Sequence, residues 1–267
     1  MSTLSNSSPI DPGRVALALG DLACRFDVDA IAECDSTNTQ LMRRAEAGAP
    51  SGSVLVAARQ SAGRGRRGRS WISAPGDSLT FSLLWRFRAT SRAPAGLSLA
   101  AGLAVARGLE ALGADGIGLK WPNDILHDNR KLGGILIELA SADPRAAVIG
   151  VGVNLRLPEA LPAELRGASA GLDALLERVP QVETVLASIL GSLARTCERY
   201  AAGGFAALKP DWLARDAFRG RPVRLMSDFG PEKHGVCAGV DAEGALLLDT
   251  AAGRERLIAG ELSLRVT

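Results

Sequence analysis

Histidine and paired cysteine are scarce in this chain of 267 residues, whose only histidines are His127 and His234. The cysteines lie far apart and form no C-x-x-C pair; they are Cys24, Cys34, Cys197 and Cys237. Zinc sites place such ligands at short, regular spacings, and the sequence offers none. We therefore expect reduced, mostly buried thiols and no metal site built from protein ligands.

Long apolar runs are also missing, since no stretch approaches the roughly 20 apolar residues of a membrane span. Residues 1–13 are polar and include Asp11, where a secretion signal would carry basic residues. These residues are predicted to form a disordered lead-in, and the protein is predicted to be cytoplasmic. The aromatic content of 4% and the net charge of +2 argue against a nucleic-acid-binding module.

The spacing of apolar and turn residues is typical of an α+β fold. Ser36 is the expected N-cap of a helix that ends at Gly48, and longer helices are expected at 95–113 and 182–202. Strands are expected at 53–59, 79–87, 117–120, 133–140 and 146–155.

The residue pattern changes after Gly220. Short strand-like runs follow, separated by glycine or proline turns, and they predict a small β-barrel of SH3 type. We place the domain boundary near Arg219, so that 14–219 forms the larger domain and 220–267 the barrel.

Residues 63–69 read Gly-Arg-Gly-Arg-Arg-Gly-Arg and formally match the G-x-G-x-x-G pattern of dinucleotide-binding folds. That interpretation requires a helix after the loop and an acidic residue about 20 positions further on. Residues 70–76, which include Pro75 and Gly76, cannot begin a helix, and arginines rather than an acid surround position 88. The dinucleotide interpretation is therefore excluded.

What remains is an arginine-rich glycine loop in a window without acidic residues, between Glu46 and Asp77. Guanidinium groups bind phosphate oxygens in pairs, and glycine lets the backbone close over a ligand. For this segment alone, a solvated basic loop and a nucleic-acid patch are equally open.

Lysine is rare, with four lysines against 27 arginines. Lys120 ends an apolar strand and begins the segment Lys-Trp-Pro-Asn-Asp, so a compact ammonium group is expected at the edge of the core. A strand-end lysine that merely reaches into water is the alternative. Gly133 and Gly134 would let a ligand or another backbone approach their strand, and Asn154 needs either a backbone or a ligand partner inside an apolar run.

Taken in order, the motifs of this chain resemble those of biotin–protein ligases over residues 31–265. They are Asp35-Ser36-Thr37-Asn38, Gln60 with the arginine–glycine loop, Lys120–Asp124, Lys131–Leu136 and Gly150–Asn154. The pattern of 235–248 also looks like the small barrel of that family. The resemblance implies a catalytic domain with a mixed β-sheet packed by helices, followed by an SH3-like barrel.

The resemblance also implies a two-step reaction. Biotin attacks the α-phosphate of Mg²⁺-bound ATP to give biotinyl-adenylate and pyrophosphate, and a lysine of a biotin carboxyl carrier domain then attacks the mixed anhydride. Lys120, Arg64 and Arg66 would be the catalytic residues, because preorganised cations stabilise the charge that develops when two anions meet. The Mg²⁺ ion is expected to arrive on the nucleotide.

Two overlapping sets of binding residues follow from the resemblance. Biotin would be bound by Ser36, Thr37, Asn38, Gln60, Gly63, Arg64, Gly65, Arg66, Lys120, Gly133, Gly134 and Ile135. ATP and the adenylate would be bound by Arg64, Arg66, Arg67, Arg69, Trp71, Lys120, Asn123 and Asn154. Trp71 would cover the adenine, and loop 63–69 would close over the intermediate, which water hydrolyses.

A lipoate- or octanoate-transferring relative is the nearer alternative, and a nucleic-acid-binding module is the more distant one. The arginine–glycine loop and the run Gly133–Leu136 favour biotin. Specific DNA binding is not expected, because Arg14–Cys34 has room for about one helix and a strand and carries more acidic than basic residues. The family resemblance permits a monomer or a homodimer.

Overall fold

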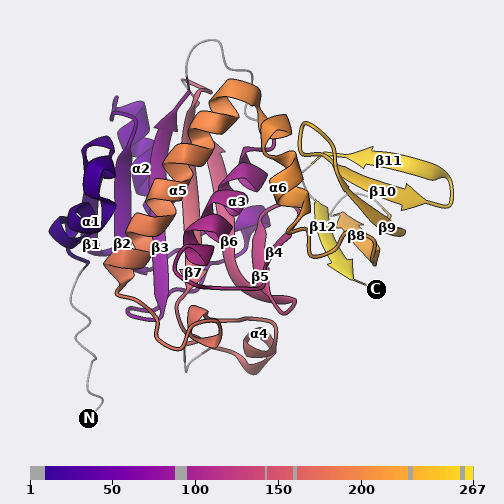
Figure 1. Ribbon diagram of the computed structural model, residues 1–267, viewed down its shortest axis with the longest axis horizontal. Helices are drawn as coiled ribbons and strands as arrows, with labels where there is room; N and C mark the ends of the chain where they lie inside the picture. The colour runs from indigo at the N-terminus through magenta and orange to yellow at the C-terminus, as the bar shows by residue number, and fades with distance from the viewer. Residues whose placement is uncertain are drawn as a thin grey trace.

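The computed structural model describes residues 10–87, 95–141, 143–158, 161–227, 231–258 and 262–266. Residues 1–9 of the predicted lead-in lie outside these ranges, and Pro12 already begins the first helix. Figure 1 shows a sheet covered by helices, with a second, smaller sheet on the C-terminal side. The predicted α+β class is confirmed.

The larger sheet is mixed and has seven strands in the order β1-β2-β3-β7-β6-β5-β4. Strands β1 and β2 are parallel, and the other neighbours are antiparallel. The strands are β1 (Asp27–Cys34), β2 (Ser53–Gln60), β3 (Ser78–Arg86), β4 (Ile117–Lys120), β5 (Asp124–His127), β6 (Arg130–Leu139) and β7 (Ala146–Asn154).

All five strands predicted for this domain are present, and β6 begins earlier than predicted. Asp128 and Asn129 adopt positive φ values of 49° and 60°, which form a tight turn between β5 and β6. Pairing in this hairpin extends the strand back to Arg130. Strands β1 and β5 were not predicted, since β5 has only four residues and β1 is interrupted by Asp27, Asp29 and Glu33.

Two long helices cover one face of the larger sheet (Figure 1). The α-helices are α1 (Pro12–Leu19), α2 (Thr37–Glu46), α3 (Leu97–Glu110), α4 (Ala163–Gly167), α5 (Val182–Gly203) and α6 (Lys209–Leu213). Short 3₁₀ helices lie at Gly20–Arg25, Arg66–Gly68, Leu172–Ala174 and Phe205–Ala207. Helix α3 is shorter than its predicted range because Gly96 and Gly113, with φ values of 74° and 92°, bound it.

Side chains alternate between the two faces of the sheet, as the pleat requires. On β3, Leu79, Phe81 and Leu83 face α3 and α5 in the main core. Leu84 faces the opposite side, where it packs against Leu41 of α2. The hydroxyl-bearing residues at alternate positions of β3 share that second side, so the α2 side of the sheet is the polar one.

The C-terminal sheet has five strands in the order β11-β10-β9-β8-β12, all antiparallel, and matches the predicted SH3-like unit. Its strands are β8 (Pro222–Ser227), β9 (Lys233–Val240), β10 (Leu246–Thr250), β11 (Gly253–Leu257) and β12 (Leu262–Val266). Within the described ranges, no helix combines the length and apolar character that crossing a membrane requires.

The small sheet is attached to the larger one beside β4. The backbone N–H of Leu119 donates to Arg215 O at 2.7 Å, and the N–H of Ala217 donates to Leu119 O at 2.9 Å. The indole N–H of Trp121, which is 1% exposed, donates to Gly244 O in the turn between β9 and β10. The small sheet therefore supports the turn that follows Lys120.

Gly108→Ala should destabilise the fold, because a Cβ at Gly108 would lie 2.8 Å from Ile189 Cα and force α3 and α5 apart. We expect the free energy of unfolding, measured by urea titration, to fall by about 1–3 kcal/mol. Gly102→Ala on the same helix is the control, since its new Cβ would meet only Leu119 Cδ2 at 3.7 Å. Equal losses in the two variants would contradict this packing argument.

Candidate functional site

A cavity of about 690 Å³ opens on the α2 side of the larger sheet. Of the predicted site residues, Ser36, Thr37, Asn38, Gln60, Arg64, Gly65, Arg66, Arg67, Arg69, Trp71, Lys120, Asn123, Gly134, Ile135 and Asn154 line it. Motifs that are far apart in the sequence are thus brought together because they lie at strand ends and helix starts on one side of the sheet.

Gly63 and Gly133 are not among the lining residues. A Cβ at Gly63 would lie 2.4 Å from Trp71 O, and one at Gly133 would lie 2.7 Å from Gly152 O. Both glycines therefore permit close backbone contacts behind the cavity wall.

One end of the cavity is a buried polar cluster at the start of α2. Ser36 caps this helix by accepting the Thr39 N–H at 3.5 Å. The Thr37 N–H donates to Gln60 Oε1 at 2.7 Å, and Asn38 Nδ2 donates to Glu138 Oε2 at 2.9 Å. These side chains present amide and hydroxyl groups at fixed positions, as recognition of a small polar ligand requires.

The arginine–glycine loop forms one wall. Its base is closed by the Gly65 N–H, which donates to Arg69 O at 2.7 Å, and Arg67 adopts a positive φ of 60°. Only a single 3₁₀ turn occurs here, and the chain then runs extended, in agreement with the exclusion of a dinucleotide-binding helix.

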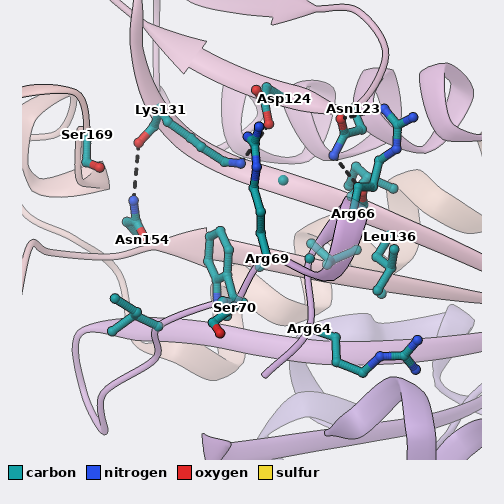
Figure 2. A pocket seen from close by; sticks show the side chains of 18 of the residues that line it. Arg64, Arg66, Arg69, Ser70, Asn123, Asp124, Lys131, Leu136, Asn154 and Ser169 are labelled. Atoms are coloured by element: carbon teal, nitrogen blue, oxygen red, sulfur yellow. Dashed lines mark hydrogen bonds and ion pairs between the residues drawn. The ribbon is translucent and has the colours of Figure 1, made fainter. Parts of the chain in front are cut away.

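The arginines of this loop point in different directions (Figure 2). The Arg64 guanidinium reaches away and pairs with Glu138 at 2.8 Å. The Arg66 Nη1 donates to Asn123 Oδ1 at 3.2 Å, and Arg69 extends toward Asp124. To contact a ligand phosphate, Arg64 would have to leave Glu138.

Two lysines share one carboxylate at the opposite end of the cavity. The Asp124 carboxylate lies 3.3 Å from Lys120 Nζ and 2.7 Å from Lys131 Nζ. Burial lowers the pKa of the Lys120 ammonium, and Asp124 offsets this only in part. Burial alone would raise the pKa of the Asp124 carboxyl, but Lys131 and Lys120 outweigh it and hold that pKa below its ordinary value.

Trp71 covers the cavity beside these lysines. The Lys131 ammonium lies 5.8 Å from the centre of the Trp71 ring. A Cβ at Gly152 would lie 2.5 Å from this ring, so glycine is needed there for the indole to lie against β7. Asn154 finds its partners locally, since its Nδ2 donates to Lys131 O at 3.2 Å and to Ala170 O at 3.1 Å.

Several lining or supporting residues were not predicted. Asp124 and Lys131 lie inside motifs that were recognised, and Lys131 is one of only four lysines, so its rarity was an available signal. Phe218, Arg221 and Arg265 reach the cavity from the C-terminal part of the chain. No local pattern marks them, because only the attachment of the small sheet beside β4 brings them there.

Two family models match the chain. The model described as the biotin/lipoate A/B protein ligase family matches residues 31–154, and that of the biotin protein ligase C terminal domain matches residues 218–265.

Curated relatives and solved structures agree with these matches. The bifunctional ligase/repressor BirA of Escherichia coli is 37% identical over 240 residues, which cover 86% of this chain and 72% of that protein. The biotin--[acetyl-CoA-carboxylase] ligase of Paracoccus denitrificans is 37% identical over 240 residues, with coverages of 87% and 98%. The structure of the Aquifex aeolicus biotin protein ligase in complex with biotin and ATP superimposes with a TM-score of 0.79 at 28% identity, over 91% of this chain and 99% of that one.

The mixed sheet, the cavity with cations at one end and amides at the other, and the small C-terminal sheet suit an enzyme that activates a small carboxylic acid. The matches identify the group more narrowly. The chain belongs to the biotin protein ligase family.

Asp124→Asn should destabilise the fold, because it leaves the buried Lys120 ammonium without its carboxylate. We expect the free energy of unfolding to fall by about 3 kcal/mol at neutral pH. Because the folded pKa of Asp124 lies below the ordinary 3.8, its contribution is present above that value and is lost as the pH falls through the folded pKa.

The difference between wild type and variant, measured by chemical denaturation, should therefore shrink below about pH 4. The exposed Glu46→Gln is the control and should show no such trend. A difference that stays constant down to low pH would show that the lysine–carboxylate pairing does not stabilise the fold.

Proposed function

We propose that this chain activates biotin with ATP to biotinyl-5′-AMP and transfers the biotinyl group to a lysine of a biotin carboxyl carrier protein domain. The observation that carries this proposal is one cavity with the amide and hydroxyl cluster of Ser36–Asn38 and Gln60 at one end and Lys120, Lys131, Arg66 and Arg69 at the other. The first end suits the ureido ring of biotin, and the second suits a carboxylate that meets a phosphate.

In the first step, a biotin carboxylate oxygen attacks the α-phosphorus of ATP, and pyrophosphate leaves. Lys120 and Lys131 offset the negative charge on the attacking carboxylate and the phosphate, because Asp124 keeps both ammonium groups in place. Arg66 adds a further cation on the loop side, and Trp71 supplies a flat surface for the adenine. The Mg²⁺ ion is brought by the nucleotide phosphates.

In the second step, the neutral amine of the carrier lysine attacks the acyl carbon, AMP leaves with the bonding electrons, and the nitrogen loses one proton to water. The adenylate must be kept from water until the carrier arrives. Closure of loop 63–69 would provide this protection, because its glycines permit rearrangement and its arginines can exchange partners for phosphate oxygens.

The proposal is tested by incubating the purified chain with ATP, biotin and a biotin carboxyl carrier domain. We expect the carrier to gain one biotinyl group by mass spectrometry, with no product when ATP is omitted or when the acceptor lysine is replaced. Octanoate and lipoate are supplied in parallel. Transfer of either of these acids in preference to biotin would overturn the proposal.

Lys120→Ala is expected to fold and to lower the adenylation rate by a factor of roughly 10²–10³, because a cation beside the reacting phosphate is removed. Pyrophosphate release at saturating biotin and ATP measures this rate. Lys209→Ala, which removes a lysine outside the cavity lining, is the control. A rate within a few-fold of wild type would make Lys120 a purely structural residue.

We also propose that the chain does not bind DNA selectively. Val15 of α1 is buried in the main core, and strand β1 is paired with β2, so this stretch is part of the catalytic fold. Fluorescence anisotropy with duplex DNA should show only weak binding that fades with salt. Sequence-selective binding that strengthens with biotin and ATP would overturn this point.

Several broader assignments belong to the same proposal. The catalytic domain comprises 14–219 and the barrel 220–267, with a boundary near Arg219. The protein works in the cytoplasm, as a monomer or a homodimer.

A further inference from the structure

A row of hydrogen-bonded polar side chains runs from the amide end of the cavity into the sheet. Ser82 of β3 is fully buried, and its Oγ lies 2.6 Å from Asn38 Oδ1 and 2.8 Å from Thr37 Oγ1. On the far side, Asn38 Nδ2 donates to Glu138 of β6 at 2.9 Å. Neither Ser82 nor Glu138 lines the cavity, and the proposed reaction gives neither of them a part.

Glu138 determines which group donates and which accepts in each hydrogen bond of this row. Its carboxylate, paired with Arg64 at 2.8 Å, only accepts, so Asn38 turns Nδ2 toward Glu138 and Oδ1 toward Ser82. An amide oxygen also only accepts, so the single Ser82 hydroxyl proton is donated to Asn38 Oδ1.

Ser82 in turn determines which hydroxyl donates in its contact with Thr37. With the Ser82 proton already used, the 2.8 Å contact between the two hydroxyls is a hydrogen bond only when Thr37 donates to Ser82. Gln60 Oε1 is a second acceptor for the Thr37 hydroxyl, but this contact is longer, at 3.1 Å, and the same oxygen already accepts the Thr37 N–H at 2.7 Å. The Thr37 hydroxyl therefore retains only lone pairs for a ligand in the cavity it lines.

We infer that Ser82 and Glu138 are positioning residues that make Thr37 a hydrogen-bond acceptor for an N–H group of the acid substrate. A cyclic urea presents N–H groups, whereas an octanoyl or lipoyl chain presents none. The relay Glu138–Asn38–Ser82–Thr37 thus assigns part of the preference for biotin over plain acyl chains to two residues behind the cavity wall. This inference rests on the proposed function.

Ser82→Ala is the first test, because it removes the relay hydroxyl with almost no change of shape. Asn38 Oδ1 loses its donor, and only the longer contact with Gln60 Oε1, at 3.1 Å, then holds the Thr37 proton away from the ligand, so the KM for biotin should rise about tenfold. The KM for ATP and kcat should stay within about twofold of wild type, because the nucleotide end is untouched.

Ser78→Ala is the matched control. Ser78 lies four residues earlier on the same face of β3 and is also buried, but within the described residues its hydroxyl has no hydrogen-bond partner. It does not line the cavity, so all three kinetic constants should stay within about twofold of wild type.

Glu138→Gln tests the direction itself, because a neutral amide can donate as well as accept and allows the whole relay to reverse. This side chain is 24% exposed, so the variant provides a second measurement even if Ser82→Ala folds poorly. We expect a rise of about tenfold in the KM for biotin here too.

A double-mutant cycle shows whether Ser82 acts through Thr37. Once Thr37→Val has removed the acceptor, Ser82→Ala should raise the KM for biotin by less than about twofold more. An undiminished effect in that background, or a Ser82→Ala enzyme that behaves like Ser78→Ala, would overturn the inference. Carrier biotinylation by the wild type would then still support the proposed function, whereas its absence would refute that function itself.

Discussion

The Asp124 carboxylate and the two ammonium groups that it holds are the contact on which the rest of the site depends. In the proposed reaction the cavity brings two anions together, which requires cations, and cations that lie close to one another repel. Asp124 begins β5 and lies opposite Gly134 of β6, so the hairpin register places it between Lys120 and Lys131. The small C-terminal sheet secures the same turn through Trp121, so both sheets contribute to this arrangement.

Glycines, which have no side chain, shape the cavity as much as the side chains that line it. A Cβ at Gly150 would lie 2.2 Å from Asn38 Oδ1, and one at Gly152 would lie 2.5 Å from the Trp71 ring. The two glycines are two apart on β7 and therefore face the same side of the sheet. Gly150 therefore makes room for Asn38 at the amide end of the cavity, and Gly152 makes room for Trp71 beside the lysines.

The sequence predicted five of the seven strands of the larger sheet and the helices α2, α3 and α5. It also predicted fifteen of the residues that line the cavity, because glycine, lysine and arginine in unusual settings leave local signals. Asp124 and Lys131 lay within recognised motifs but were given no role, since their importance comes from their mutual distance. Ser82 left no signal at all, because a serine in a strand is ordinary until Asn38 is found 2.6 Å away. Such residues are defined by strand order and register, which a single sequence does not display.

Glu138 connects the two ends of the site, since it holds both Asn38 and Arg64. The Arg64 side chain is 49% exposed in this pair, and an ion pair so open to water contributes about 0–1 kcal/mol. A charge-assisted, paired contact with phosphate oxygens inside a cavity is stronger. In the proposed reaction, the exchange of Glu138 for a phosphate would therefore cost little free energy and would strengthen the contacts of Arg64. Protein contacts would then hold the loop in the absence of ligand and the adenylate would hold it once formed, without any change in the sheet beneath it.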